Sequence, residues 1–114
     1  MTIKRPADCQ SMEDVRAEID ELDIALVALI GQRFGYVERA WQIKRTENGE
    51  ANVPWRNQQV VDRVRAKAQA VGVPPDLCEA LWRQMIGWFI QYEEEKLRTE
   101  RANERGSDGL GSGK

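Results

Sequence analysis

Four charged side chains at helical spacings are candidates for binding a small anion: Arg16, Arg33, Lys44 and Glu93. Arg33 and Lys44 are separated by 11 residues, a rotation of about 1100° on an α-helix, or about 20° after whole turns. Both cations are therefore expected on one helix face, about 16 Å apart along the axis. Since two long cationic side chains at this spacing can reach toward one dianion, they are predicted to form one side of a pocket.

Arg16 cannot belong to that pocket within its own chain. It precedes Arg33 by 17 residues, which displaces it by about 25 Å along the helix and rotates it by about 100°. If Arg16 binds the same ligand, it must do so in the site of a second copy. Each cation also has an ordinary alternative: Arg16 as a surface partner of Asp20, Arg33 as a solvated cation, and Lys44 as a cation favoured at a helix C-terminus.

Glu93 continues an apolar stripe formed by Trp82, Ile86 and Phe89, in steps of 4, 3 and 4 residues. Burial of a carboxylate on such a stripe would raise its pKa, and the protonated form could then donate a hydrogen bond. The alternative is that the stripe has already reached solvent at Glu93, because two further glutamates follow it directly.

The composition argues against several other chemistries. The chain has no histidine, and Cys9 and Cys78 form no CxxC pair, so neither an activated nucleophile nor a metal site is expected, and no cofactor is implied. The net charge of −2, without a basic stripe, predicts no nucleic-acid partner. Because there is no membrane-length apolar run and no signal-peptide core, the expected location is the cytoplasm, without a membrane partner.

Apolar periodicity predicts an all-α fold of three helices. In the first, which has Ser11 as N-cap, apolar residues recur in steps of 4, 3, 4 and 3 from Val15 to Leu29. The pattern then continues to about Arg45 without a proline. The second helix is expected from about Trp55 to Val71, with Gly72 after its end, and the third from about Asp76 to Arg101.

The first helix would be about 50 Å long, whereas a compact domain of this chain length has a radius of gyration of about 13 Å. One chain cannot cover such a helix, so a homodimeric helical bundle is expected. Residues 1–10 are predicted to form an N-terminal arm, residues 11–101 the helical domain, and residues 102–114, which are rich in Gly and Ser, a disordered tail.

The order of these residues is similar to a known family. The stretch from Arg16 to Asp23, followed by Gln32-Arg33 and then by Tyr36 to Lys44, resembles the opening helix of the all-helical chorismate mutases. The resemblance covers about residues 8–97, and the stretch Pro6 to Cys9 is similar to the isochorismate-pyruvate lyase branch and its mutase-like relatives. It implies an intertwined dimer of three-helix chains that binds a dianionic small molecule, chorismate or isochorismate.

The resemblance also implies a shared site. Arg33, Lys44 and a second-helix arginine would come from one chain, together with a third-helix Gln or Glu, and Arg16 would come from the partner. Arg56 is the candidate for the second-helix arginine. Asn57 stands where many bacterial members carry a glutamate that meets the substrate hydroxyl.

Roles in the reaction follow from the same resemblance. Glu93 stands where many bacterial members carry Gln and fungal members Glu. Arg16 and Arg33 would bind the substrate carboxylates with help from Arg56. Lys44 and protonated Glu93 would donate to the ether oxygen.

The implied activity is the pericyclic rearrangement of chorismate to prephenate, an isomerase reaction of aromatic amino acid biosynthesis that needs no cofactor. Three alternatives remain open. An isochorismate-pyruvate lyase would use the same cations to eliminate pyruvate from isochorismate and give salicylate. A 4-amino-4-deoxychorismate mutase would use a related substrate. A non-enzymatic helical dimerisation module would explain the long apolar seam but not the cofacial Arg33 and Lys44.

Overall fold

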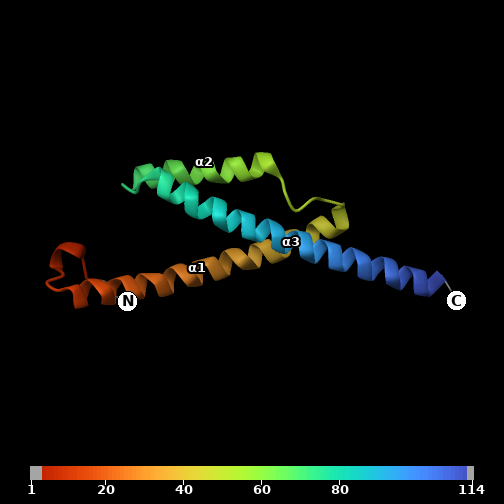
Figure 1. The fold of residues 1–114 in the computed structure, drawn as a ribbon, viewed down its shortest axis with the longest axis horizontal. Coiled ribbons are helices and arrows are strands. Elements are labelled where there is room, and N and C mark those ends of the chain that lie inside the picture. Colours follow the sequence, from red (N-terminus) through yellow and green to blue (C-terminus); the bar gives the residue numbers. More distant parts are fainter. Residues whose placement is uncertain (1–3, 113–114) are drawn as a thin grey trace. The chain divides into compact units, whose positions relative to one another are not determined.

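The structure is a computed structural model that describes residues 4–112. In chain order, this part holds a short 3-10 helix, η1 (Pro6–Asp8), and the helices α1 (Met12–Glu47), α2 (Pro54–Ala70) and α3 (Pro75–Ser112) (Figure 1). The described residues contain no strand, which confirms the all-α prediction. None of these helices is both long and apolar enough to cross a lipid bilayer.

The chain divides into two compact units, Met1–Tyr36 and Val37–Lys114, and α1 contributes residues to both. In the first unit, the arm before α1 is fastened to the first turns of the helix. The backbone amide of Lys4 donates to Glu18 at 3.2 Å, and its ammonium lies 3.5 Å from Asp14. The arm therefore packs on its own helix through polar contacts.

The N-terminus of α1 is capped as the sequence predicts. The Asp14 amide donates to the Ser11 hydroxyl oxygen at 3.1 Å, and the Asp14 carboxylate accepts the Gln10 amide at 3.0 Å. This reciprocal pair satisfies two amides that a helix start leaves open. From there α1 runs for 36 residues, about 54 Å, without a break at Gly31 or Gly35. The predicted long first helix is confirmed.

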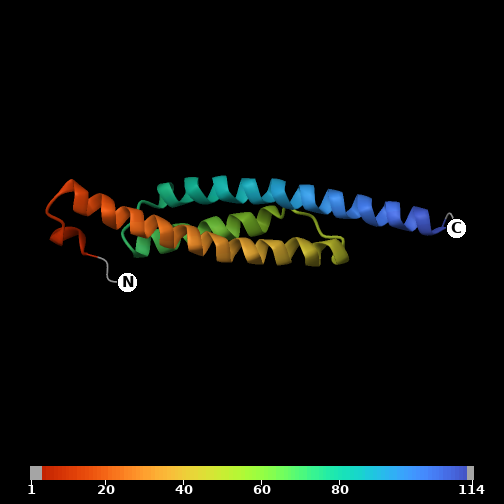
Figure 2. The ribbon, with the colours of Figure 1, turned by 90° about the horizontal axis from the view of Figure 1, so that it is seen from below.

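In the second unit, α2 and α3 run side by side in opposite directions, as both views show (Figures 1 and 2). Val61 and Ala68 of α2 and Phe89 of α3 are buried. The turn between the helices requires Gly72, whose φ of 79° lies in the left-handed region that glycine adopts without strain. The helix starts and this turn lie within a residue or so of their predicted positions.

The last turns of α1 pack on α3 within the same unit. Trp41, Ala51 and Leu97 form a buried cluster, and Tyr92 packs against it. The Glu38 carboxylate accepts hydrogen bonds from the Trp41 indole, at 3.2 Å, and from the Tyr92 hydroxyl. This contact fixes the end of α1 against the middle of α3.

The C-terminal end of α3 differs from the prediction. The sequence predicted that the third helix ends near Arg101 and that residues 102–114 form a disordered tail, whereas α3 continues to Ser112. Residues 113–114 lie outside the described part. Two ion pairs support the helix as far as Glu104, since Arg45 lies 3.3 Å from Glu100 and 3.4 Å from Glu104. No proline follows Pro75, so nothing forces the helix to stop earlier.

Candidate functional site

Two of the candidate residues meet in the second unit. The Lys44 ammonium lies 3.2 Å from one carboxylate oxygen of Glu93 and 3.5 Å from the other. Glu93 is only 6% exposed, so the alternative in which the apolar stripe has reached solvent at this residue is excluded. An ammonium and a buried carboxyl group thus lie together at the crossing of α1 and α3.

Two opposing effects act on the Glu93 carboxyl group. Burial raises its pKa, because the charged form loses hydration, and the Lys44 ammonium lowers it through charge attraction and a hydrogen bond. Burial is the larger effect, so the pKa of Glu93 stays above the ordinary value. At a given pH, more of this carboxyl group is protonated than in an exposed glutamate.

The backbone after α1 folds back onto Lys44. Asn48 adopts a left-handed conformation with φ of 59°, and the Gly49 amide then donates to the Lys44 carbonyl at 2.8 Å, a helix-ending bond of the Schellman type. A Cβ at Gly49 would lie 3.1 Å from Cγ of Lys44, so a larger residue here would push the Lys44 side chain aside by a few tenths of an ångström. Two residues later, the Ala51 carbonyl accepts a hydrogen bond from the Lys44 ammonium at 3.2 Å.

Arg101 of α3 reaches the same segment. Its guanidinium donates to the Gly49 carbonyl at 2.9 Å and to the Lys44 carbonyl at 3.4 Å. Sequence analysis did not single out Arg101 for this role. Both acceptors are backbone groups more than 50 residues away in sequence, 52 for Gly49 and 57 for Lys44, and backbone acceptors leave no residue pattern.

The two candidates on α2 bind nearby protein groups. Arg56 is exposed and donates to the Gln59 side chain at 2.7 Å, on its own helix. Asn57 donates to Asn52 at 2.8 Å, which ties the start of α2 to the loop that carries the Ala51 carbonyl. Neither hydrogen bond is to Lys44 or Glu93, and the predicted substrate contacts of Arg56 and Asn57 stay predictions.

The other two candidates lie on the part of α1 that belongs to the first unit. Arg16 is exposed and Arg33 is half-buried. Lys44 follows on the same continuous helix, in the part that belongs to the second unit. The assignment of Arg16 to a partner's site stays a prediction.

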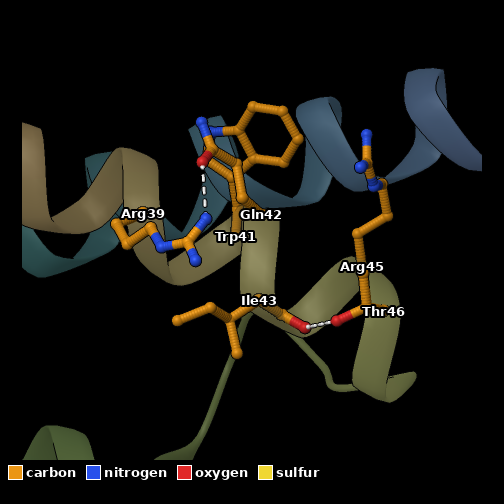
Figure 3. Close-up of a pocket in the computed structure, with 6 residues that line it drawn as sticks. All are labelled: Arg39, Trp41, Gln42, Ile43, Arg45 and Thr46. Atoms are coloured by element: carbon orange, nitrogen blue, oxygen red, sulfur yellow. Dashed lines mark hydrogen bonds between the residues drawn. The ribbon is translucent and has the colours of Figure 1, made fainter.

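Two surface pockets lie near the end of α1. One is lined by Arg39, Trp41, Gln42, Ile43, Arg45 and Thr46 (Figure 3). In this pocket Arg39 donates to Gln42 at 3.2 Å, so that cation is already engaged. The other lies over the loop and α3, lined by Glu50, Ala51, Asn52, Glu94, Leu97, Arg98 and Arg101. Neither of these two linings includes Lys44 or Glu93. The candidate site is therefore defined by the ion pair itself and not by either pocket.

Comparison with known proteins identifies similar chains. The model of a family described as chorismate mutase type II matches residues 15–94, a range that includes Arg16, Arg33, Lys44 and Glu93. The isochorismate pyruvate lyase of Pseudomonas aeruginosa is 29% identical over 99 residues, which cover 87% of this chain and 97% of the lyase. The T-protein of Enterobacter agglomerans is 32% identical over 82 residues, which cover 72% of this chain and 22% of the T-protein. Arg101 lies beyond the matched family region.

The opposing effects on Glu93 give a first prediction. Replacing Lys44 by Met removes the ammonium that lowers the pKa of Glu93, so this pKa is expected to rise further. Carboxyl carbon-13 NMR of the Glu93 side chain across a pH titration measures the change. Lys96→Met is the matched control, because Lys96 lies about one turn from Glu93 but contacts the rings of Trp41 and Tyr92. An unchanged pKa of Glu93 in Lys44→Met would contradict the assigned ion pair.

Proposed function

We propose that this chain, which belongs to the chorismate mutase type II family, catalyses the rearrangement of chorismate to prephenate. The observation that carries the proposal is the meeting of the Lys44 ammonium with the buried Glu93 carboxyl group, 3.2 Å apart. One group is a cation, and the other is a carboxyl group whose pKa is raised by burial, so that more of it is protonated than in an exposed glutamate at the same pH. Both can donate hydrogen bonds to a substrate oxygen on which negative charge develops.

The proposed reaction suits these residues. In the [3,3] rearrangement a carbon–oxygen bond breaks while a carbon–carbon bond forms in the same molecule, and no proton is gained or lost. The protein must hold the chair-like diaxial conformer of the substrate and stabilise charge on the ether oxygen. Neither task needs a nucleophile, a metal ion or a cofactor.

Each candidate residue has a proposed role. Lys44 and protonated Glu93 donate to the ether oxygen, and removal of one such donor typically raises the barrier by about 3–4 kcal/mol. Arg33 and the partner's Arg16 bind the two carboxylates, and Arg56 assists them. Asn57 is proposed to contact the substrate hydroxyl, in exchange for its present hydrogen bond to Asn52. The chain would then serve aromatic amino acid biosynthesis in the cytoplasm.

A second candidate function is the isochorismate-pyruvate lyase reaction. The observation that favours it is the match to the Pseudomonas aeruginosa lyase, which spans 97% of that protein. The same cations would bind isochorismate, and elimination would release salicylate and pyruvate. A mutase acting on 4-amino-4-deoxychorismate would use the same site on a related dianion. The non-enzymatic dimerisation module is not supported, since the matched family and the lyase are named as enzymes.

An assay with separate substrates tests these functions. Purified protein is incubated with chorismate, isochorismate or 4-amino-4-deoxychorismate, and products are separated by liquid chromatography. We expect prephenate from chorismate with a larger kcat/KM than for salicylate from isochorismate. The reverse ranking would replace the mutase by the lyase, and no product from any substrate would refute both. Lys44→Met, purified in parallel, reports any contaminating enzyme from the expression host.

We further propose that the chain works as an intertwined homodimer. The predicted apolar seam of α1 is left open within a single chain: Ile19, Leu22, Leu26 and Leu29 are between 46% and 58% exposed. Large side chains exposed in a row mark an interaction surface. A second copy of this chain is the proposed occupant of this surface. Within one chain, Arg16 lies too far from Arg33 along α1 to reach the same ligand. Packing of two copies along α1 would bring Arg16 into the partner's site.

Mixed dimers test the shared site. Arg16→Ala and Lys44→Met are each expected to be nearly inactive, because every site lacks one cation. Co-expressed in equal amounts, they should recover about a quarter of the wild-type activity, since half of the dimers are mixed and each mixed dimer keeps one intact site. No recovery despite confirmed mixed dimers would place Arg16 and Lys44 in the same chain's site. A monomer in size-exclusion chromatography would also contradict the shared site.

The protonation state of Glu93 gives another prediction. If the neutral carboxyl group donates to the ether oxygen, wild-type activity falls as the pH rises through the pKa of Glu93, which burial raises. Glu93→Gln carries a donor that does not titrate, so we expect it to keep activity and to extend that activity to higher pH. The measurement is the pH profile of kcat, with Glu94→Gln as an exposed neighbouring control. Identical profiles for Glu93→Gln and wild type would show that Glu93 is not a neutral donor.

A further inference from the structure

The contacts that hold Lys44 extend beyond its pair with Glu93, to a residue outside the matched family region. We propose that Arg101 is a positioning residue, which locks the end of α1 and the following loop so that the Lys44 ammonium is held at the site. The inference rests on the function proposed above for Lys44. It assigns a role in that site to the part of α3 that follows residue 94.

Arg101 acts on the backbone at two places. It donates to the Gly49 carbonyl at 2.9 Å and to the Lys44 carbonyl at 3.4 Å. The second carbonyl also accepts the Gly49 amide, at 2.8 Å, which ends α1. Both bonds come from one terminal nitrogen of the guanidinium, Nη2, which carries two N–H donors. One side chain thereby fixes the helix end and the first residue of the loop.

The locked loop in turn holds the ammonium. Ala51 follows Gly49 by two residues, and its carbonyl accepts the Lys44 ammonium at 3.2 Å. Ala51 is buried against Leu97, which lies one helical turn before Arg101 on α3. The path from Arg101 to the Lys44 ammonium is thus continuous: guanidinium, Gly49 carbonyl, loop, Ala51 carbonyl, ammonium.

The neighbouring ion pairs do not replace this contact. Arg45 pairs with Glu100 and Glu104, but all three side chains are at least a third exposed, so water and salt weaken the attraction. These pairs join α1 to α3 without contacting the loop, whereas Arg101 binds the Gly49 carbonyl in the loop. Without Arg101, the Arg45 ion pairs and the packing of Ala51 against Leu97 remain, but the Gly49 carbonyl loses its donor, so we expect the loop and the Ala51 carbonyl to shift relative to Lys44.

The effect on catalysis is expected to be large because the reaction depends on positioned donors. A misplacement of about 1 Å at such a group can lower the rate by about 100-fold. Arg101→Met keeps much of the apolar stem but cannot donate, so we expect kcat for chorismate to fall by about 10-fold or more, with a smaller change in KM. Arg101→Lys retains one donor for the Gly49 carbonyl and should recover part of the loss.

The matched control is Arg98→Met, one turn earlier on α3. Arg98 lines the same surface pocket as Arg101 but pairs with Glu95 on its own helix. This variant should match wild type in kcat. Melting temperatures of all variants show whether a loss of activity follows from a loss of folded protein.

A readout without turnover separates this inference from the proposed function. When Lys44 is released, its effect on Glu93 weakens, so in Arg101→Met the pKa of Glu93 should move toward its value in Lys44→Met. Carbon-13 NMR measures this shift even if the wild type converts no chorismate, an outcome that would refute the function alone. Should Arg101→Met fail to fold, Arg101→Lys carries both measurements. Wild-type kcat and an unchanged pKa of Glu93 in a folded Arg101 variant would overturn the positioning role.

Discussion

The ion pair between Lys44 and the buried Glu93 is the interaction on which the candidate site depends. Removing a carboxylate and an ammonium from water is costly, and their attraction offsets that cost only with good geometry and further hydrogen bonds. The pair has such support, because Lys44 also donates to the Ala51 carbonyl at 3.2 Å. A hydrophobic pair of similar size would often be as stable. The choice of charged groups is therefore better explained by what they can bind than by stability.

Both apolar and polar contacts hold α1 against α3 near this ion pair. The apolar contact that joins α1, the loop after it and α3 is small, consisting mainly of Trp41, Ala51 and Leu97 with Tyr92 beside them. Polar contacts on either side, from the Glu38 carboxylate and from Arg101, complete the crossing. Much of the remaining apolar surface of α1 is exposed in the single chain. A helix whose end is fixed by directional bonds, and whose middle is left open, keeps its apolar face available for another chain.

Much of this architecture could be predicted from the sequence, because it is encoded locally. The Ser11 cap, the length of α1 and the left-handed Gly72 all follow from short patterns. The spacing of Glu93 left burial and a solvent-exposed position both open, and the packing of α3 shows that it is buried. The continuation of α3 past Arg101 could not be predicted, because the ion pair that supports it at Glu104 comes from Arg45, more than 50 residues earlier.

The hydrogen bonds of Arg101 and Asn57 could not be predicted from the sequence for a related reason. Arg101 donates to backbone carbonyls, which every residue carries, and Asn57 binds a loop whose path depends on the tertiary fold. A pattern of residue types records which side chains face the core. It does not record which backbone groups a long polar side chain will reach.

The donor count of Lys44 indicates why an ammonium suits this position. It has three N–H donors and no acceptor. The Ala51 carbonyl takes one, and the two Glu93 carboxylate oxygens, at 3.2 and 3.5 Å, take the others. An incoming oxygen would compete for the longer of the two contacts with Glu93. When Glu93 is protonated, its hydroxyl becomes a donor as well, so the two side chains can present their hydrogens to the same ligand atom. Such an arrangement works only while the two protein acceptors stay in place, and that ties the chemistry of the pair to the rigidity of the loop after α1.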